Sequence, residues 1–533
     1  MSRSRRGALA RTAGSGCNET RNVHRLANAV LHRQNRWRRA FGGRKVCLSA
    51  VQTHSRNAFV TSFAIVATAG SWISARRNVR FFWFSSIVGS ALLLLAPAIW
   101  NGFPFLFYDS GAYIELAIQG GFRPERSAFY AYFLSAFWPK VSIWPAISAQ
   151  VLLTVLVMAE FARVLAPGIS PGRFFLIVAA LWVGTGLPWN AADILPDILA
   201  PLLVLCLYLL GFHADRLSWP HKAALIAVAT LAATAHASHL GLAAGLFAVI
   251  AVMQSVTRRV KSPFASPRWQ LPALVFALSL ASLVASNFAL TGDVFVSRSG
   301  PAFLFARLEQ DGIAKRLLDD TCPQSGYRLC PYKDDLPNDS NDYLWGWQSP
   351  FQKLGGFDGT ADEAKTMIAE SLKRYPWLNL KMAVLDTLEQ FVTFKTGDGV
   401  EPLNDIPVPA MERQIPDQVE LYLASRQRNG RIAFEWINAV HMPIGALAII
   451  ALAAILVEGA LRRNWNDRVF LPAFVLLALF GNAFICGVFS SPHDRYQSRL
   501  IWLACFAVLL IARRRPGELP PRHLPDGRID PSP

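Results

Sequence analysis

Long, continuous apolar runs constrain the fold of this chain more than any other feature. Stretches such as residues 81–100 and 435–458 hold about twenty residues with few charges, the length of helix that crosses a hydrocarbon core about 30 Å thick. Only 17% of the residues are charged and 53% are hydrophobic, whereas soluble domains carry roughly 25% charged residues. A membrane barrel would instead need alternating segments of about ten residues. The sequence therefore predicts an all-α polytopic membrane protein.

The apolar runs predict about ten transmembrane helices. These are residues 81–100, 144–165, 173–189, 195–212, 222–236, 239–256, 270–290, 435–458, 469–489 and 498–512. With a cytoplasmic N-terminus, all five short inside loops are basic, as in Thr257-Arg-Arg-Val-Lys261 and Arg513-Arg-Arg515. Basic loops face the cytoplasm. Both termini are therefore predicted in the cytoplasm, with residues 291–434 outside a plasma or inner membrane.

Two apolar segments are not counted as spans. Residues 58–74 are short and flanked by arginines, which favours an interfacial or re-entrant position. Residues 127–138 predict an aromatic helix in the interface, because counting them would place every later basic loop outside. The net charge of +17 comes largely from the N-terminal segment. That segment is predicted to be an anchor on anionic lipid, or to precede the true start codon. An RNA-binding tail is the weaker alternative, so no nucleic-acid partner is expected.

The predicted organisation has five parts. They are a basic, disordered cytoplasmic segment 1–79, a transmembrane domain 80–290, an extracytoplasmic domain 291–434, transmembrane helices 435–513 and a disordered cytoplasmic tail 514–533. The extracytoplasmic domain is expected to be mixed but mainly helical. Residues 319–360 are rich in turn formers. Helices are predicted over 361–374 and from Pro376 to about Phe394, the second lying flat on the outer face of the bilayer.

The cysteines agree with this orientation. Cys322 and Cys330 lie in the outer segment, where oxidation is favoured, and a turn through Ser325 and Gly326 would bring their sulfurs together. We predict a disulfide, with a zinc pair as the alternative. The cysteines in apolar spans are expected to be small core residues; they are Cys206, Cys486 and Cys505.

Carboxylates in the outer loops are the candidate catalytic groups. Asp109 follows the first span in an aromatic loop, where a carboxylate must be solvated, paired or held for chemistry. It can act as a general base, or it can cap the helix that follows, with Glu115 solvated. Asp193 and Asp197 share one helix face at the second outer loop. Capping is the alternative for them as well.

Basic and aromatic residues complete the set. His236 and His239 lie one turn apart and are candidates for a substrate contact, a metal or simple hydrogen bonding at a hairpin. The last outer loop offers cations suited to a phosphate, with interfacial anchoring as the alternative. Its candidates are His493, Arg495, Tyr496 and Arg499. The sequence has no nucleotide-binding or hydrolase motif of the GxGxxG, P-loop, GxSxG or HExxH type. A divalent metal is neither required nor excluded.

Three short motifs, together with the acids at the second outer loop, carry a family resemblance. The first loop contains Tyr108-Asp109-Ser-Gly-Ala-Tyr113, followed by Pro124-Glu-Arg-Ser-Ala-Phe129, and a His-Asp-Arg-Tyr element precedes the final span. With these motifs the chain, from about residue 80 to 512, resembles the C-type glycosyltransferase superfamily of integral membrane enzymes. That superfamily includes aminoarabinose transferases and protein O-mannosyltransferases. Unlike its better-known members, the chain has Ser110 after the first-loop acid and no Asp-x-Asp pair.

The resemblance implies inverting transfer of a sugar from a polyprenyl-phosphate donor to a glycan, lipid or protein acceptor on the outer face. Asp109 would activate the acceptor and Arg495 would contact the lipid phosphate. Further substrate-binding candidates are Tyr108, Tyr113, Glu115, Arg123 and Arg126. Asp109, one of Asp193 or Asp197, and Arg495 are expected to line one outer-facing cavity. Trp345, Trp347 and Phe351 are predicted either to stack on sugars or to fill a domain core.

Two other classes of function remain open. A transporter or flippase would bury its charges and helix breaks at the midplane and show internal repeats, whereas the acids here cluster at loop edges. A non-catalytic envelope assembly protein would use the charged loops only as anchors, so replacing Asp109 would then have no effect.

Overall fold

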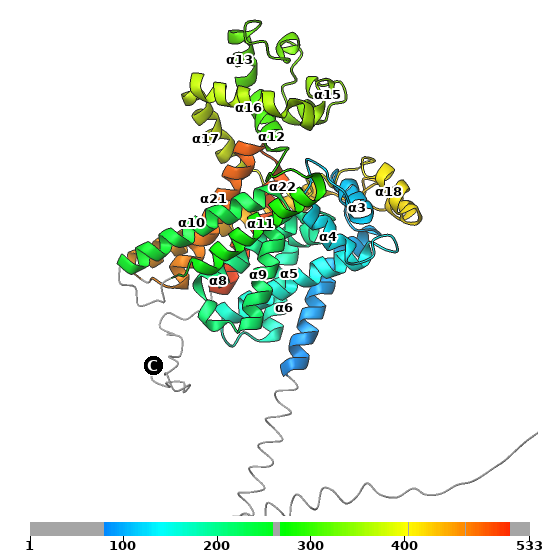
Figure 1. The fold of residues 1–533 in the computed structure, drawn as a ribbon. Coiled ribbons are helices and arrows are strands. Elements are labelled where there is room, and N and C mark those ends of the chain that lie inside the picture. The colour runs from blue at the N-terminus through cyan, green and yellow to red at the C-terminus, as the bar shows by residue number, and fades with distance from the viewer. Residues whose placement is uncertain (1–78, 260–266, 403, 464, 512–533) are drawn as a thin grey trace, which may run out of the picture. The chain divides into compact units, whose positions relative to one another are not determined.

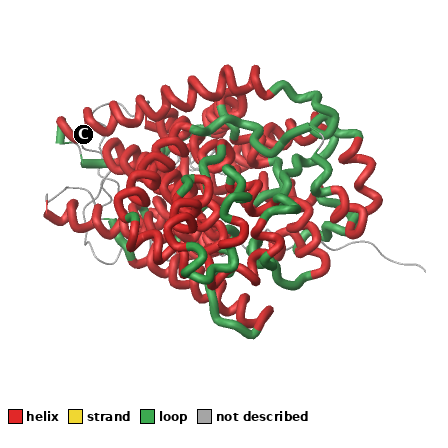
Figure 2. The backbone as a smooth tube through the Cα atoms, turned by 90° about the horizontal axis from the view of Figure 1, so that it is seen from above, coloured by secondary structure: helices red, strands yellow, loops and turns green. Residues whose placement is uncertain are grey.

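The computed structural model describes residues 79–259, 267–402, 404–463 and 465–511. These residues form helices joined by loops, with two isolated bridges and no strand among them (Figures 1 and 2). The predicted N-terminal segment up to residue 78, including the apolar stretch 58–74, lies outside the described residues. So does the predicted tail 514–533. The all-α fold class is confirmed for the described part of the chain.

Six helices are long and apolar enough to cross a membrane, which makes the chain an integral membrane protein. They are Val79–Asn101, α5 (Trp144–Leu165), α10 (Ala237–Arg259), α11 (Gln270–Thr291), α20 (Phe434–Leu461) and α21 (Asp467–Phe489). Each coincides with a predicted span. Local chemistry sets the ends: for example, the side chain of Asn466 accepts from Arg468 N and caps α21.

The other four predicted spans coincide with helices that are shorter or more polar, so six is fewer than the ten predicted. They are α6 (Pro171–Gly184) with α7 (Leu187–Ala191), η1 (Pro196–Ile198) with α8 (Leu199–Phe212), α9 (Trp219–Thr234) and α22 (Asp494–Ile511). Nearly all of α8 is buried, so this central helix need not match the lipid thickness. α22 begins with charged residues in its first two turns.

The remaining helices are short, apart from two in the outer segment. They are α3 (Ser110–Gln119), α4 (Ala128–Ser135), η2 (Ala214–Arg216), α12 (Gly300–Gln310), α13 (Ile313–Thr321), η3 (Cys330–Tyr332), α14 (Ser340–Trp345), α15 (Pro350–Lys353), α16 (Gly356–Arg374), α17 (Pro376–Val392), α18 (Val408–Gln414), η4 (Pro416–Gln418) and α19 (Val419–Leu423). The two helices predicted over 361–374 and from Pro376 are present as α16 and α17. Within 127–138, α4 has eight residues, too few to span a bilayer.

The segment 291–434, predicted as one domain, contains two parts with different packing partners. Helices α12 to α16 enclose a core of their own, in which Phe305, Tyr343 and Phe351 are at most 1% exposed. The later part packs on the core of the bundle, through residues such as Met411 and Tyr422. Phe351 is therefore a core residue, whereas Trp345 and Trp347 are 45% and 84% exposed.

The predicted disulfide between Cys322 and Cys330 is present and closes the turn after α13. Cys206, Cys486 and Cys505 are buried free thiols, as expected of core residues.

A buried carboxyl group in the outer core creates a pH dependence that the sequence does not reveal. Glu309 in α12 is 4% exposed, and its Oε2 has no hydrogen-bond partner among the described residues. Burial, together with the charges of Asp339, Asp311 and Asp342, raises the pKa of Glu309 to about 8 from an ordinary value of 4.5. The folded protein therefore favours the protonated carboxyl, and its stabilising contribution is lost as the pH rises from about 4.5 through 8.

Replacing Glu309 by Gln should consequently stabilise the outer part at pH 8, by about 1–2 kcal/mol after allowance for solvent screening, because the amide mimics the protonated acid. The gain should shrink toward pH 4.5. Thermal unfolding between pH 4.5 and 8.5 measures the effect, with exposed Glu412→Gln as the matched control. A gain that does not vary with pH would contradict the assignment.

Candidate functional site

The loop that follows the first long helix, Val79–Asn101, is held against the segment after α7 by backbone hydrogen bonds. Phe105 N donates to Ala192 O at 3.1 Å, and Ile194 N donates to Phe105 O at 3.0 Å. The hydroxyl of Ser110 also donates to Ile194 O, at 3.0 Å. Asp109 therefore belongs to a loop that is fixed to residues 192–194.

The carboxylate of Asp109 forms ion pairs and does not cap a helix. Asp109 occupies the N-cap position of α3, but its side chain makes no capping hydrogen bond. Its Oδ1 accepts from Nη2 of Arg126, and its Oδ2 accepts from Nη1 of Arg495 at 3.5 Å. With the Asp109 side chain 16% exposed, the structure favours pairing over the capping alternative.

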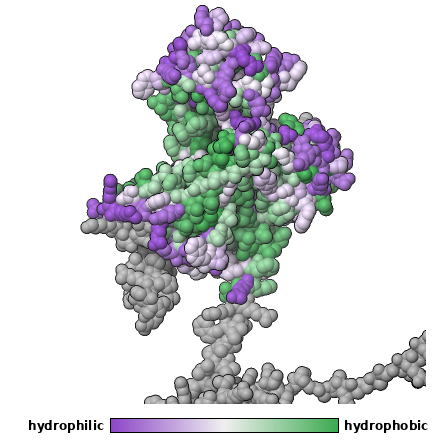
Figure 3. Space-filling model, viewed as in Figure 1, coloured by the Kyte–Doolittle hydropathy of each residue, from purple (hydrophilic) through white to green (hydrophobic). Residues whose placement is uncertain are grey.

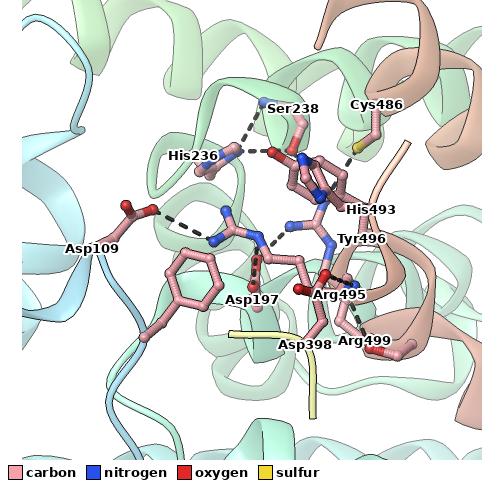
Figure 4. Close-up of polar contacts among 12 residues, drawn as sticks. Asp109, Asp197, His236, Ser238, Asp398, Cys486, His493, Arg495, Tyr496 and Arg499 are labelled. Atoms are coloured by element: carbon pink, nitrogen blue, oxygen red, sulfur yellow. Dashed lines mark hydrogen bonds and ion pairs between the residues drawn. The ribbon is translucent and has the colours of Figure 1, made fainter. Parts of the chain in front are cut away.

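The ion pairs continue inward as a chain of alternating charge (Figure 4). Nε of Arg495 lies 3.8 Å from Oδ2 of Asp197, and Nη1 of Arg499 donates to Oδ1 of Asp197 at 2.5 Å. The order is Arg126, Asp109, Arg495, Asp197 and Arg499; we call these five residues the charge chain. Ion pairs thus bring Asp109, Asp197 and Arg495 together, across 386 residues of sequence from Asp109 to Arg495.

The three arginines of the charge chain have unused donors. The Nε atoms of Arg126, Arg495 and Arg499 are buried and have no hydrogen-bond partner in the described part of the chain. A buried charged donor without an acceptor is costly. Because a guanidinium presents a planar fork that matches phosphate oxygens, this group of three cations has the chemistry to bind an anionic ligand.

Aromatic rings hold the innermost cations in place. The Arg495 guanidinium carbon lies 4.1 Å from the ring centroid of Phe107 and 4.9 Å from that of Tyr496, and Arg499 lies 5.3 Å from the Tyr496 ring. Such cation–π contacts strengthen where water is excluded. The predicted candidates Arg495, Tyr496 and Arg499 therefore form one packed unit at the start of α22.

Arg499 is also bound by residues that the sequence did not single out. Its Nη2 donates to Ser238 Oγ and Asn482 Oδ1, each at 3.1 Å, and lies 3.6 Å from Cys486 Sγ. These partners come from α10 and α21. Arg499 is fully buried, so it fixes the charge chain to the bundle.

The two histidines of the α9–α10 hairpin form local hydrogen bonds. Nδ1 of His236 lies 2.8 Å from Ser238 Oγ, and Nδ1 of His239 lies 2.9 Å from Ala232 O. The Nε2 atom of His239 is buried without a partner among the described residues. His236 therefore reaches the charge chain through Ser238, the serine that also binds Arg499.

Asp193 lies beside the charge chain without joining it. Its backbone carbonyl accepts from Gln150 Nε2 at 2.8 Å, while its Oδ1 is buried without a hydrogen bond in the described structure. Burial, with the charge of Asp197 adding to it, raises the pKa of Asp193 well above its ordinary value. Of the two predicted aspartates, Asp197 forms ion pairs within the charge chain and Asp193 does not.

The tyrosines of the first loop have separate roles. The hydroxyl of Tyr108 donates to the Glu401 carboxylate. Tyr113 is buried, with its ring 5.0 Å from that of Tyr130 in an edge-on contact. Tyr108 thus ties the first loop to the segment after α17, whereas Tyr113 is a core residue.

Glu115 and Arg123 form an ion pair away from the charge chain. Nη2 of Arg123 lies 2.7 Å from Glu115 Oε2, and Arg413 of α18 lies 3.6 Å from the same oxygen. Arg123 contacts the charge chain through its backbone, where its carbonyl accepts from Arg126 N at 3.3 Å. Neither side chain forms an ion pair with the charge chain, so the structure does not bring these two side chains into the candidate site.

Helix α14 bridges two edges of the site. At its start, Asn341 Nδ2 lies 3.4 Å from Nε2 of His493, which is also 3.2 Å from Ser491 Oγ. At its end, Trp345 lies against Arg126, 5.7 Å from ring centroid to guanidinium carbon. Burial lowers the pKa of His493. His493 therefore connects α14 to the last outer loop and makes no ion pair with the charge chain.

The segment 393–401, here called the strap, was missed by the sequence interpretation. Asp398 Oδ2 accepts from Arg495 N at 2.9 Å, and in return Asp494 Oδ1 accepts from Lys395 N at 2.5 Å. These reciprocal bonds fix the strap to the first turn of α22. The signal in the sequence is Gly397-Asp-Gly399, an acid between two residues that tolerate sharp turns.

Gly399 packs where no side chain fits. Its φ is +76°, and a Cβ there would lie 1.8 Å from the ring of Phe107. Replacing Gly399 by Ala should therefore destabilise the protein by about 1–3 kcal/mol more than backbone strain alone. Gly292→Ala is the matched control, because Gly292 has φ +79° and open space around it. Thermal unfolding of both variants in detergent measures the difference. Equal losses would mean that the strap does not press on Phe107.

No group of three or more His, Cys, Asp or Glu side chains that could hold a metal ion occurs in the described ranges. The polar groups that converge are those of the charge chain, with Asp193, His236, Ser238 and Asp398 around it.

Comparison with known proteins assigns no family. No family model, no curated protein and no solved structure matches the chain. Its chemistry therefore has to be inferred from the residues of the site.

Proposed function

We propose that this protein is a membrane glycosyltransferase that moves a sugar from a polyprenyl-phosphate donor to an acceptor on the outer face of the membrane. The supporting observation is the charge chain, in which Asp109 and Asp197 alternate with three arginines whose Nε atoms are buried without a hydrogen bond in the described structure. It lies at helix ends of an apolar bundle, where the phosphate of a lipid-linked donor would be located.

The proposed topology has ten spans, with both termini in the cytoplasm and residues 291–434 outside. Four of these spans are the short or polar helices α6, α8 with η1, α9 and α22. Basic loops support this orientation, for instance Arg258 and Arg259 at the end of α10 and Arg462 and Arg463 after α20. The charge chain then lies on the extracytoplasmic side.

In the proposed reaction, the N–H groups of Arg495 form hydrogen bonds to the phosphate of the polyprenyl-phosphate sugar. Arg499 lies next to Arg495, further inside the bundle. Asp109 then loses one of its two cationic partners, which makes it a stronger base. Its carboxylate takes the proton of an acceptor hydroxyl as that oxygen bonds to the anomeric carbon. The bond from the anomeric carbon to the phosphate oxygen breaks, and polyprenyl phosphate leaves with the electron pair, stabilised by the guanidinium groups.

Binding of polyprenyl phosphate tests the cation assignment. Arg495→Gln should weaken binding of a short-chain polyprenyl phosphate about tenfold or more, because a hydrogen bond to a charged group contributes about 1.5–3 kcal/mol. Arg495→Lys keeps the positive charge but lacks the planar guanidinium. Its affinity should lie between those of Arg495→Gln and the unmodified protein. Titration calorimetry in detergent measures the affinities, after thermal unfolding has shown that the variants are folded.

Arg428→Gln is the matched control, since Arg428 pairs with Asp405 in the same outer segment and away from the charge chain. Its affinity should be unchanged. The assignment fails if Arg495→Gln binds as tightly as the unmodified protein, or if the uncharged polyprenol binds as tightly as the phosphate.

A flippase for a lipid-linked substrate is the second candidate. It is favoured by the Asp197–Arg499 pair, whose side chains are 5% and 0% exposed between helices of the bundle, as buried charges are in transporters. Reconstitution distinguishes the two: movement of a fluorescent polyprenyl-phosphate sugar across the bilayer, without transfer to any acceptor, would favour the flippase.

A further inference from the structure

Helix α17 has the polarity pattern of a helix that faces lipid. Its buried residues are all polar: Asn379, Asp386, Thr387 and Gln390. Its large apolar residues are 46–79% exposed: Trp377, Leu380, Val384, Leu385, Leu388 and Val392. Two charged residues, Lys381 and Glu389, are exposed as well. The large apolar residues recur at intervals of three, four and seven residues and so share one face. A helix in water would show the opposite arrangement, and apolar patches of this kind mark interaction surfaces.

The helix lies along α21, which is long and apolar enough to span the membrane. A Cβ on Gly487 would lie 2.6 Å from Asp386 O, so the two backbones touch there. Further along, the rings of Phe391 and Phe480 are 6.4 Å apart. As α17 proceeds from 386 to 391, its partner positions run from 487 back to 480. The two helices are therefore antiparallel.

The exposed face of α17 continues that of α21. Leu477, Phe480 and Phe484 of α21 are 43–49% exposed, as expected for side chains that contact acyl chains. Figure 3 shows the hydrophobic surface of the bundle continuing over the region that α17 occupies in Figure 1. One unbroken surface of this kind requires one apolar environment.

The geometry of the two helices gives the depth of α17 in the bilayer. From Asp467 to Gly487, α21 rises about 30 Å at about 1.5 Å per residue, which equals the thickness of the hydrocarbon core. If the core begins near Asp467, Asp386 lies close to its outer boundary. Val392 then lies about 9 Å deeper, and Trp377 lies on the headgroup side. Lys381, on the exposed face, is placed to reach lipid phosphates.

We infer that α17 is inserted end-on into the outer leaflet, with its C-terminal half in the hydrocarbon and its N-terminal end among the headgroups. The exposed face of α17 thus contacts the lipid bilayer. This inference holds whether or not the protein transfers sugars. It differs from a helix lying flat on the surface, the arrangement expected from amphipathicity alone, because every residue of a flat helix would have similar depth. It also places the strap, which follows Val392, below the headgroups.

Spin labels at four positions test this inference. Leu380, Val384, Leu388 and Val392 are each replaced by Cys in a protein that carries Cys17→Ser and Cys47→Ser, and the label is introduced in liposomes. The parent without an added Cys measures background labelling of the buried thiols. Leu477→Cys on α21 gives the lipid reference and Lys365→Cys on α16, 60% exposed, gives the water reference.

The measured quantity is the accessibility of each label to oxygen and to a water-soluble nickel chelate. Oxygen access should rise and nickel access should fall several-fold from position 380 to 392, with 392 approaching the Leu477 reference. Equal values at all four positions would show a flat helix, and values like those at Lys365 would place α17 in water. Low access to both reagents with spin–spin broadening between molecules would show that a second copy covers the face. Each of these three results would overturn the inference.

Discussion

Replacing Asp109 by Asn should abolish sugar transfer while leaving the protein folded. The amide keeps the size of the carboxyl but cannot accept the acceptor's proton, and loss of a general base lowers rates by about 10²–10⁴-fold. Affinity for polyprenyl phosphate should persist or increase, because Arg495 loses a competing carboxylate. Initial rates with a radiolabelled polyprenyl-phosphate sugar, set beside the binding titration, measure the two effects.

The control for this variant is Glu115→Gln, which changes an acid of α3 whose ion-pair partners among the described residues are Arg123 and Arg413. It should retain transfer. Near-normal turnover in Asp109→Asn would mean that the Asp109 carboxylate serves only to hold Arg126 and Arg495 in place.

The largest loss of stability is expected from Arg499→Met. This change leaves the Asp197 carboxylate buried without its closest cation, and breaking a buried ion pair from one side costs about 3–5 kcal/mol. It also leaves Asn482 and Ser238 without the guanidinium that they bind. Thermal unfolding in detergent should show the loss.

A second change should reverse part of that loss. Asp197→Asn in the Arg499→Met background removes the uncompensated charge, so the double variant should be more stable than the single one. Arg428→Met, which breaks a more exposed pair with Asp405, should cost at most about 1 kcal/mol. An Arg499→Met variant that unfolds no earlier than this control would show that the charge chain does not stabilise the bundle.

The sequence predicted the helices well, because their apolar runs and proline or serine starts are local signals. Six of the ten predicted spans correspond to helices that are long and apolar enough to cross a bilayer, and the other four correspond to shorter or more polar helices. One of these four, α8, is buried on nearly all sides. Apolar character alone does not distinguish a short central helix from a span that faces lipid.

The chemistry of sugar transfer predicts that Asp109 and Arg495 lie close together, because a general base and a phosphate-binding cation must flank the same anomeric carbon. Glu115, six residues after Asp109, lies outside the charge chain, because six residues turn a helix by about 600° and place the side chain on another face. The same reasoning did not identify Asp398, whose role depends on a bond to Arg495 N across 97 residues. The strap has no periodic pattern of apolar residues, so its sequence does not indicate that it contacts the start of α22.

The most direct test of the proposed function is an electron cryomicroscopy structure in a lipid nanodisc with a non-transferable polyprenyl-phosphonate sugar. The proposal predicts phosphonate density within hydrogen-bond distance of the Arg495 guanidinium, with the anomeric carbon facing the Asp109 carboxylate and the prenyl chain running between apolar helices. Density for the analogue at another surface, with Asp109 and Arg495 still paired as in the free protein, would contradict it.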